Sequence, residues 1–232
     1  MLNKLNEFYS CIIPTKEIIM AGIDEAGRGP VVGPMVYGLY VASENEISHY
    51  KDSKLLTPVA REHFFKNMRN YSCYKIHPAY ISSHMEAGSM NLNEIAKEAV
   101  IYLLKDLVSK CPNVKTVYID GLGNNEEYKK TLKKYFSLNF VIENKADSKY
   151  QVVSGASIVA KVVRDASVAR YNCGSGYTSD PITKEWLKSK YNKFLGFPDY
   201  VRHSWSTVKD MLPSKKSRKL QKEFHGFYSG SN

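Results

Sequence analysis

The amino-acid sequence predicts an α/β fold built on a mixed five-stranded sheet. Its first three strands are expected to be antiparallel, its later strands parallel, and helices are expected on its flanks. The 232 residues, 43% of them hydrophobic, are enough to bury a core without disulfides or metals as staples. Two short apolar runs near the start are joined by turn residues, which is typical of a hairpin. Further along, apolar runs alternate with helical patterns, which is typical of parallel pairing.

The first two predicted strands are residues 18–23 and 34–41, which combine apolar, aromatic and β-branched side chains. Residues 24–30 between them contain two glycines and a proline, so we expect a hairpin with an elaborated loop. Residues 71–77 have a similar composition and are predicted to form the third strand.

The central part of the chain predicts helices and strands in alternation. Thr57 followed by Pro58 is an N-cap and first-turn signal for a helix that reaches about residue 70. Residues 92–107 carry apolar side chains at three- and four-residue spacing with charged residues on the opposite face, which predicts an amphipathic helix. A strand, a helix and a strand are then expected over residues 114–119, 126–135 and 140–142.

The last long helix, predicted over residues 150–171, has small and β-branched apolar side chains on almost every face, so we expect it to be buried. It also carries Lys161, Arg164 and Asp165. A charge on a buried helix must be paired or bound to something, because its removal from water is costly. Asp165 is therefore a candidate site residue, with pairing to Lys161 one turn earlier as the alternative.

The chain carries 33 Lys and Arg against 23 Asp and Glu, and this net charge of +10 favours a polyanionic partner such as nucleic acid. Residues 1–180 hold 22 basic and 19 acidic side chains, whereas residues 181–232 hold 11 and 4. The four cysteines are too widely spaced for a zinc ribbon. No run reaches about 18 apolar residues, so we expect a soluble intracellular protein with no membrane partner. It would be nuclear in a eukaryote and cytoplasmic otherwise.

Acidic residues stand at the ends of two predicted strands. Asp24 and Glu25 follow the first strand directly, and Asp120 follows the strand over residues 114–119. Ligand sites of α/β sheets gather at strand ends, so these acids and Asp165 are candidates for one site. Four carboxylates repel one another unless cations lie among them, and oxygen ligands without His or Cys favour Mg²⁺ or Mn²⁺. The pattern indicates a metal-dependent nuclease, although an acid of this kind taken alone is more often a turn former or helix cap than a metal ligand.

The string Asp24-Glu25-Ala26-Gly27-Arg28-Gly29-Pro30 resembles the signature of the type 2 ribonucleases H. Further motifs resemble that family in order and spacing, from about residue 18 to residue 211. They are Lys51-Asp52-Ser53-Lys54-Leu55-Leu56, Asn91-Leu92-Asn93-Glu94, Tyr118-Ile119-Asp120-Gly121, Lys145-Ala146-Asp147, Ser157-Ile158-Val159-Ala160-Lys161-Val162-Val163-Arg164-Asp165, Gly174-Ser175-Gly176-Tyr177 and Asp180-Pro181. Met35-Val36-Tyr37 is most similar to the catalytic A subunit of the eukaryotic enzymes.

The resemblance implies a ribonuclease H-like fold and a metal-dependent endonuclease that hydrolyses the RNA strand of RNA/DNA hybrids. It also implies nicking on the 5′ side of a single ribonucleotide embedded in duplex DNA, which leaves 3′-hydroxyl and 5′-phosphate ends and serves ribonucleotide and primer removal. Carried over by position, Asp24, Glu25, Asp120 and Asp165 match the four catalytic, metal-binding acids of the family. They are expected to hold two Mg²⁺ or Mn²⁺ ions, which stabilise the attacking and leaving oxygens of phosphoryl transfer.

Other motif residues match positions that bind the substrate in the family. Gly27, Arg28 and Gly29 match the stretch whose backbone contacts the 2′-hydroxyl at the junction, and glycine allows that close approach. Tyr177 matches the tyrosine that stacks on the sugar after the ribonucleotide. Without the motif around it, a packing role would be favoured for this tyrosine.

Basic residues are expected to complete the nucleic-acid site. The lysines expected to line the phosphate groove are Lys54, Lys145 and Lys161. Each is a point charge that releases counterions when it binds a phosphate, and a solvated surface lysine is the alternative at each position. Along the chain, we expect a catalytic domain over residues 1–180, a helical C-terminal region packed on it over residues 181–212, and a basic tail over residues 213–232.

The tail holds five basic side chains and no acid over residues 213–222, which is typical of a disordered basic segment, a nuclear-localisation signal or a nucleic-acid arm. The residues after it are similar to the sliding-clamp-binding box, in which a Gln precedes an aliphatic residue and two aromatics. The candidate clamp-binding residues are Gln221, Phe224, Phe227 and Tyr228. Phe224 stands where an aliphatic is usual, and a tail that packs on the domain is the alternative. The resemblance also implies B and C subunits of a heterotrimer as partners.

Two other functions stay open for the same residues. One is a catalytically silent nucleic-acid-binding subunit that keeps the fold and the basic groove, and the presence of all four acids counts against it. The other is a related metal nuclease that acts on DNA branches or integrates DNA. Such an enzyme does not need to sense a 2′-hydroxyl, so Gly27, Arg28, Gly29 and Tyr177 count against it.

Overall fold

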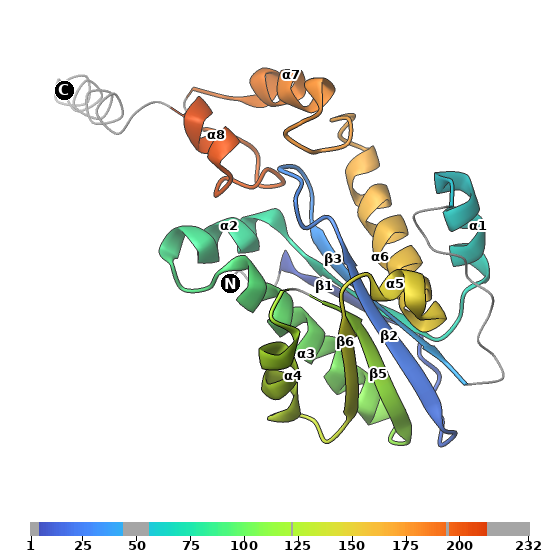
Figure 1. Cartoon of the computed structure of the whole chain (residues 1–232). Coiled ribbons are helices and arrows are strands. Elements are labelled where there is room, and N and C mark those ends of the chain that lie inside the picture. Colours follow the sequence, from blue (N-terminus) through green and yellow to red (C-terminus); the bar gives the residue numbers. More distant parts are fainter. Residues whose placement is uncertain (1–4, 44–55, 122, 194, 213–232) are drawn as a thin grey trace, which may run out of the picture.

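The computed structural model describes residues 5–43, 56–121, 123–193 and 195–212. Its centre is a six-stranded mixed sheet with the strand order β1-β4-β3-β2-β5-β6 (Figure 1). The strands are β1 (Glu7–Ser10), β2 (Ile19–Ala26), β3 (Met35–Ala42), β4 (Tyr71–Ile76), β5 (Val114–Asp120) and β6 (Asn139–Glu143). The first four strands pair antiparallel, and β2, β5 and β6 pair parallel. The predicted mixed α/β sheet is confirmed, with one strand more than the five predicted.

The extra strand is β1, at the edge of the sheet. It pairs with β4, from Glu7 opposite Lys75 to Ser10 opposite Ser72, and three of its four residues are exposed. An ion pair joins Glu7 to Lys75 at 2.6 Å. A strand this short has little preference of its own, and its conformation depends on pairing with a distant segment. The local sequence therefore did not predict it.

Helices cover both faces of the sheet (Figure 1). They are α1 (Pro58–Asn67), α2 (Pro78–Ala87), α3 (Leu92–Lys110), α4 (Asn125–Lys133), α5 (Ala146–Lys149), α6 (Gln151–Ala169), α7 (Pro181–Lys190) and α8 (Ser206–Met211). The expected cap of α1 is present, because the Thr57 hydroxyl accepts a hydrogen bond from the amide of Ala60 at 3.2 Å. α2 and α5 were not predicted. Among the described residues, no helix is long and apolar enough to cross a membrane.

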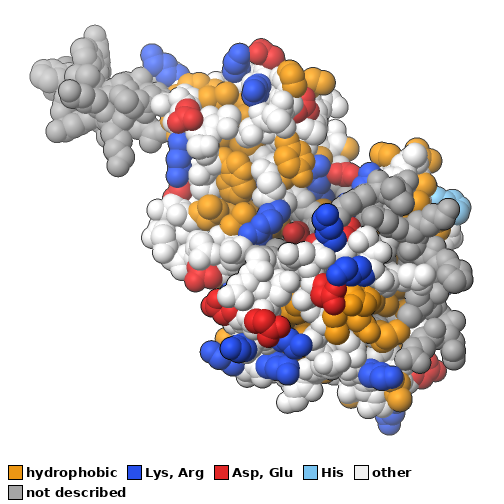
Figure 2. Space-filling model, viewed as in Figure 1, with side chains coloured by type: hydrophobic (Ala, Val, Ile, Leu, Met, Phe, Trp, Pro, Cys, Tyr) orange, Lys and Arg blue, Asp and Glu red, His pale blue; other side chains and the backbone are white. Residues whose placement is uncertain are grey.

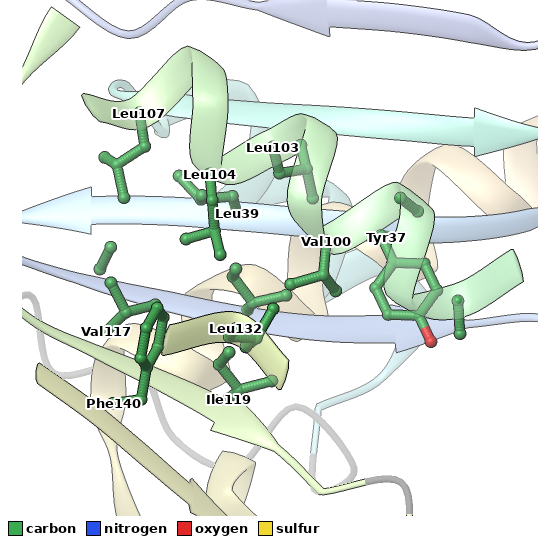
Figure 3. Close-up of a cluster of buried hydrophobic side chains, with 14 of the residues drawn as sticks. Tyr37, Leu39, Val100, Leu103, Leu104, Leu107, Val117, Ile119, Leu132 and Phe140 are labelled. Carbon is green, nitrogen blue, oxygen red and sulfur yellow. The ribbon is translucent and has the colours of Figure 1, made fainter. Parts of the chain in front are cut away.

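The larger core lies between the sheet and the face covered by α3 and α4 (Figure 3). The predicted apolar stripe of α3 is confirmed, since Leu103, Leu104 and Leu107 are fully buried against the strands. Each such leucine contributes about 1.5–3 kcal/mol through the apolar surface removed from water. α3 thus fixes the strands that end in the candidate acids.

The opposite face of the sheet is covered by α6, whose first half is buried all round, as predicted. Gly38 of β3 allows this close contact, because a Cβ atom there would lie 2.4 Å from the carbonyl oxygen of Ala156. The second half of α6 reaches the surface, where Asp165 is exposed. The expectation of a helix buried along its whole length was therefore wrong for its last turns.

The C-terminal helices pack on the loop that joins β2 to β3. Val31 and Val32 of that loop form a third core cluster, with Trp186 and Leu187 of α7 and Val208 of α8 among its members. The backbone also links these parts, for the amide of Val31 donates to the carbonyl of Gly176 at 2.8 Å. The C-terminal region therefore lies directly over the segment that follows Asp24 and Glu25 (Figure 1).

Candidate active site

Three carboxylates meet where β2 and β5 end. These strands are parallel neighbours with Ile23 beside Ile119, so Asp24 and Asp120 come at the same level of the sheet. Glu25 follows Asp24, and ligand oxygens of all three acids lie within 4.8 Å of one another. We call Asp24, Glu25 and Asp120 the carboxylate group. This result confirms the predicted meeting of these three acids.

Backbone amides orient two of the three carboxylates. The amide of Glu25 donates to Oδ1 of Asp24 at 2.7 Å. The amide of Ala146, the first residue of α5, donates to Oδ1 of Asp120 at 2.7 Å. Lys145 precedes it in the left-handed conformation, with φ of 57°, which turns the chain so that this amide can point back at Asp120. The unpredicted helix α5 therefore helps to hold the site.

Burial and mutual repulsion make the charged form of the group unfavourable. Burial raises the pKa of Asp24 to about 7; a hydrogen bond from Ser157 opposes this rise, and the charge of Asp120 adds to it. Burial, followed by the charges of Asp24 and Asp120, raises the pKa of Glu25 to about 8. A divalent cation among the three would remove this penalty, and an all-oxygen donor set fits a hard ion such as Mg²⁺ or Mn²⁺. The residues present fit a metal site.

Asp165, the fourth predicted acid, does not join this group. Its side chain is 51% exposed, and its Oδ1 accepts a hydrogen bond from Arg164 Nη1 at 3.0 Å. Asp165 is therefore paired with Arg164, the residue before it on α6. The second amino group of Arg164 donates to the backbone of Ser175 at 2.7 Å. Arg164 and Asp165 are thus held by contacts with each other and with a neighbouring loop.

A different acid, Asp147 of α5, lies close to the carboxylate group. It is only 4% exposed, and its negative charge contributes to the raised pKa of Asp24. Its neighbour Ala146 donates the hydrogen bond to Asp120 described above. The signal that could have identified Asp147 was its own motif, Lys145-Ala146-Asp147, together with its place just after a parallel strand.

The loop formed by residues 27–29 follows the first two acids and has an unusual backbone. Gly27 has a φ of 76°, and a Cβ atom there would lie 2.5 Å from the carbonyl oxygen of Pro34, so glycine is required. The buried guanidinium of Arg202 donates to the carbonyls of Gly27, Arg28 and Gly33. The indole of Trp205 donates to the carbonyl of Gly29 at 2.9 Å.

Arg202 and Trp205 were not predicted as site residues, since neither belongs to a motif recognised in the sequence. Arg202 is fully buried, and burial, with the nearby charge of Arg164, lowers its pKa to about 9. It therefore remains charged near neutral pH, and its planar fork of donors suits several carbonyls at once. The position of the 27–29 loop is set by the C-terminal region.

Tyr177 lies directly against this loop. A Cβ atom on Gly29 would lie 3.1 Å from the Tyr177 ring, and the Arg164 guanidinium lies 5.9 Å from the ring centroid. The ring is 43% exposed, which leaves one part of it open to a ligand. The structure therefore brings the 27–29 loop and Tyr177 together, as the motifs predicted.

The structure describes two of the three lysines that were predicted to bind phosphates. Lys145 is exposed at the start of α5, beside the carboxylate group, and Lys161 is half-buried on α6. Lys54 lies outside the described residues, as do the candidate clamp-binding residues Gln221, Phe224, Phe227 and Tyr228. Figure 2 shows Lys and Arg side chains close to acidic atoms in the middle of one face, between the C-terminal helices and the sheet.

Known proteins are similar to this chain in sequence and in fold. The family model described as Ribonuclease HII matches residues 21–208. The A subunit of ribonuclease H2 from Arabidopsis thaliana is 37% identical over 222 residues, which cover 85% of this chain and 75% of that protein.

Solved structures agree with the sequence comparison. The ribonuclease H2 from Pyrococcus horikoshii OT3 superposes with a TM-score of 0.74 and 34% identity, over 84% of this chain and 97% of that one. The chain in the PCNA:RNase HII complex from Archaeoglobus fulgidus gives a TM-score of 0.71 and 33% identity, over 82% and 96%. With its acids at the ends of β2 and β5 and this similarity along most of its length, the chain belongs to the ribonuclease HII family, the type 2 ribonucleases H.

Proposed function

We propose that this protein hydrolyses the RNA strand of RNA/DNA hybrids and nicks duplex DNA on the 5′ side of a single embedded ribonucleotide, leaving 3′-hydroxyl and 5′-phosphate ends. One observation carries the proposal. The 27–29 loop, with its carbonyls held by Arg202 and Trp205, lies between the carboxylate group and the Tyr177 ring. A rigid backbone beside hydrolytic acids is suited to test for a 2′-hydroxyl, which distinguishes RNA from DNA.

Four acids would hold the metal ions in this proposal: the carboxylate group and Asp147, in place of Asp165. Two Mg²⁺ or Mn²⁺ ions, when bound, supply charge neutralisation at the scissile phosphate and a water of lowered pKa. The protein orients its own ligands through the amides of Glu25 and Ala146. Burial of Asp24 and Asp147 keeps water away from that side of the group.

The neighbouring residues would position the substrate. The backbone of the 27–29 loop would contact the 2′-hydroxyl, and the exposed part of Tyr177 would stack on the following sugar. Lys145 and Lys161, with Lys54, would bind backbone phosphates on either side. The proximity of Tyr177 to Gly29 supports joint recognition of the RNA-to-DNA junction.

Partners and domains belong to the same proposal. A relative from Archaeoglobus fulgidus has been solved as a complex with PCNA. We extend this to a sliding clamp bound by the tail of the present chain, and we keep the B and C subunits as proposed partners. Deletion of residues 221–232 is expected to abolish clamp binding in a titration, and an unchanged affinity would exclude the tail. The C-terminal core cluster supports a catalytic domain (1–180) with residues 181–212 packed on it.

Cleavage of three end-labelled duplexes tests the proposal: all-DNA, DNA with one ribonucleotide, and a full RNA/DNA hybrid. With Mg²⁺ we expect nicking 5′ to the single ribonucleotide and cleavage of the hybrid, and with chelator we expect neither. Binding without cleavage by a folded protein, alone and with added B and C subunits, would favour the catalytically silent binding protein. Cleavage of the all-DNA duplex would favour a DNA nuclease of the same fold.

A further inference from the structure

Glu25 faces a different part of the protein from Asp24. Neighbouring residues of a strand point to opposite faces of a sheet. Asp24 receives a hydrogen bond from Ser157 of α6, so Glu25 faces the side covered by α3 and α4. Its direct partner in the antiparallel register is Tyr37 of β3. Side chains in such a pair begin about 5 Å apart, so the phenol of Tyr37 extends beside the carboxylate of Glu25.

Among the buried polar atoms that have no hydrogen-bond partner within the described part of the chain, three belong to residues close to Glu25. They are the hydroxyls of Tyr37 and Tyr128 and the Nη1 atom of Arg28. Tyr37 is 1% exposed and Tyr128, on α4, is 3% exposed. Figure 3 shows the hydroxyl of Tyr37 pointing away from the labelled aliphatic side chains. Native proteins rarely leave buried donors unsatisfied, so these hydroxyls are expected to have a use.

The two hydroxyls lie close enough to the same two charged side chains, Glu25 and Arg28, to be affected by their charges. Burial raises the pKa of both phenols, the negative charge of Glu25 raises it further, and Arg28 opposes these effects. The other amino group of Arg28 donates to Asn93 of α3, which fixes Arg28 on the same side of the sheet. The Glu25 carboxylate is therefore a hydrogen-bond acceptor close to the hydroxyls of Tyr37 and Tyr128.

We propose that Tyr37 and Tyr128 are positioning residues for Glu25, and that their hydroxyls donate hydrogen bonds to its ionised carboxylate, directly or through one water, when the carboxylate group holds a divalent cation. The inference rests on the proposed function because it takes Glu25 as a metal ligand. Glutamate has one more rotatable bond than aspartate, so its carboxylate needs more groups to fix it. Its own backbone amide and the charge of Arg28 already favour the ionised form of Glu25, and the two hydroxyls would add donors from the side of α3 and α4. Residues that hold a ligand in this way tune metal affinity without contact with the metal.

Mn²⁺ binding to the full chain, followed by electron paramagnetic resonance, tests this inference apart from activity. Tyr37→Phe and Tyr128→Phe remove one hydroxyl each and keep the ring. Each variant is expected to raise the Mn²⁺ dissociation constant about tenfold, as loss of such supporting contacts does elsewhere. In a Glu25→Gln background the same substitutions are expected to add little, because their effect acts through the Glu25 carboxylate.

Tyr80→Phe is the matched control. Tyr80 is also buried on this side of the sheet, but its hydroxyl already donates to Glu98 at 2.6 Å. Its loss is expected to lower the melting temperature and leave Mn²⁺ binding unchanged. Wild-type Mn²⁺ affinity in folded Tyr37→Phe and Tyr128→Phe proteins would overturn the inference alone. A wild-type protein that binds no Mn²⁺, or a Glu25→Gln variant that binds it normally, would overturn the proposed metal site and this inference with it.

Discussion

The carboxylate group and the 27–29 loop are neighbours in the chain, yet they are held in opposite ways. The acids are buried and crowded, and their pKa values rise to about 7 for Asp24 and about 8 for Glu25. The loop beside them has every backbone carbonyl paired, with Arg202 and Trp205 as the donors. The carboxylates of the first region repel one another, whereas the backbone carbonyls of the second region are all paired within the protein.

This difference matches two kinds of task. A group that must bind cations gains affinity when its empty state is unfavourable, because the cation then relieves the repulsion. A backbone that must measure a substrate gains selectivity when its position is fixed before binding. Substitutions in the carboxylate group should therefore raise stability and remove activity. Substitutions that loosen the loop should lower both.

The largest effect is expected from Asp24→Asn. Loss of one ligand should reduce cleavage of the RNA/DNA hybrid by about 1,000-fold or more, since metal ions supply several kcal/mol of charge stabilisation. In chelator the variant should melt at a higher temperature than wild type. Full activity with Mg²⁺ would contradict the assignment of Asp24.

The stability gain should depend on pH, with a sign set by the raised pKa of Asp24. Between its ordinary value of 3.8 and about 7, the folded protein holds a proton that the unfolded chain has lost. The stability of the wild type in chelator should therefore fall as pH rises through this range. Asp24→Asn should lose less stability over the same range, which thermal melts at pH values from about 4 to about 8 would measure.

The next prediction compares Asp147 and Asp165, the two acids that could complete the carboxylate group. Asp147→Asn should lower cleavage about 100-fold, because Asp147 is buried beside Asp24. Asp165→Asn should stay within about threefold of wild type, because the Asp165 carboxylate is 51% exposed and contacts Arg164 rather than the carboxylate group. Parallel rates on the same hybrid decide between them, and the reverse order would return Asp165 to the site.

A smaller effect is expected from Arg202→Lys. Lysine lacks the planar fork that reaches several carbonyls, so the variant should lose about 1–3 kcal/mol of stability. Cleavage at a single embedded ribonucleotide should fall about tenfold, in contrast to Asp24→Asn, where stability and activity move in opposite directions. Arg170→Lys is the control, because Arg170 is exposed and contacts Tyr171. An unchanged melting temperature and an unchanged cleavage rate in Arg202→Lys would show that the 27–29 loop keeps its position without the Arg202 hydrogen bonds.

The smallest effect is expected from Tyr177→Ala. Loss of one stacking ring costs about 1 kcal/mol, which is about fivefold in rate. The loss should be larger on a single embedded ribonucleotide than on a long hybrid, where many registers are cleavable. Tyr102→Ala, a substitution of a similarly exposed tyrosine on α3, should change neither rate. Equal losses on both substrates would remove the junction-sensing role of Tyr177.

Elements with a strong local pattern could be predicted from the sequence. α3 has a regular apolar stripe and a cap at Asn91, and its bounds follow closely from them. β2 and β3 are apolar runs around a loop rich in glycine. β1 and α5 are four residues each and owe their conformation to partners elsewhere in the chain, so no local pattern marks them.

The site residues that follow directly after strands could be predicted from the sequence. Residues whose place in the site depends on burial in the folded protein were harder to predict. Asp24, Glu25 and Asp120 follow from the ends of two strands that the fold makes neighbours. Asp165 was favoured by its motif and because its helix looked buried throughout, whereas in the structure the last turns of α6 reach the surface. Arg202 could not be ranked above the other basic residues, because its burial depends on contacts with residues about 170 positions earlier.

The hydrogen bonds from Arg202 and Trp205 also set an order of assembly. They join residues that are 169 to 176 positions apart in the chain. On a ribosome, which makes a protein from its N-terminus, all the proposed metal ligands have been synthesised by residue 147, long before these donors emerge. Contacts of such long range also form late in folding. The nascent chain therefore acquires last the donors that fix the loop proposed to distinguish RNA from DNA, and a chain interrupted before residue 202 would carry the acids without them.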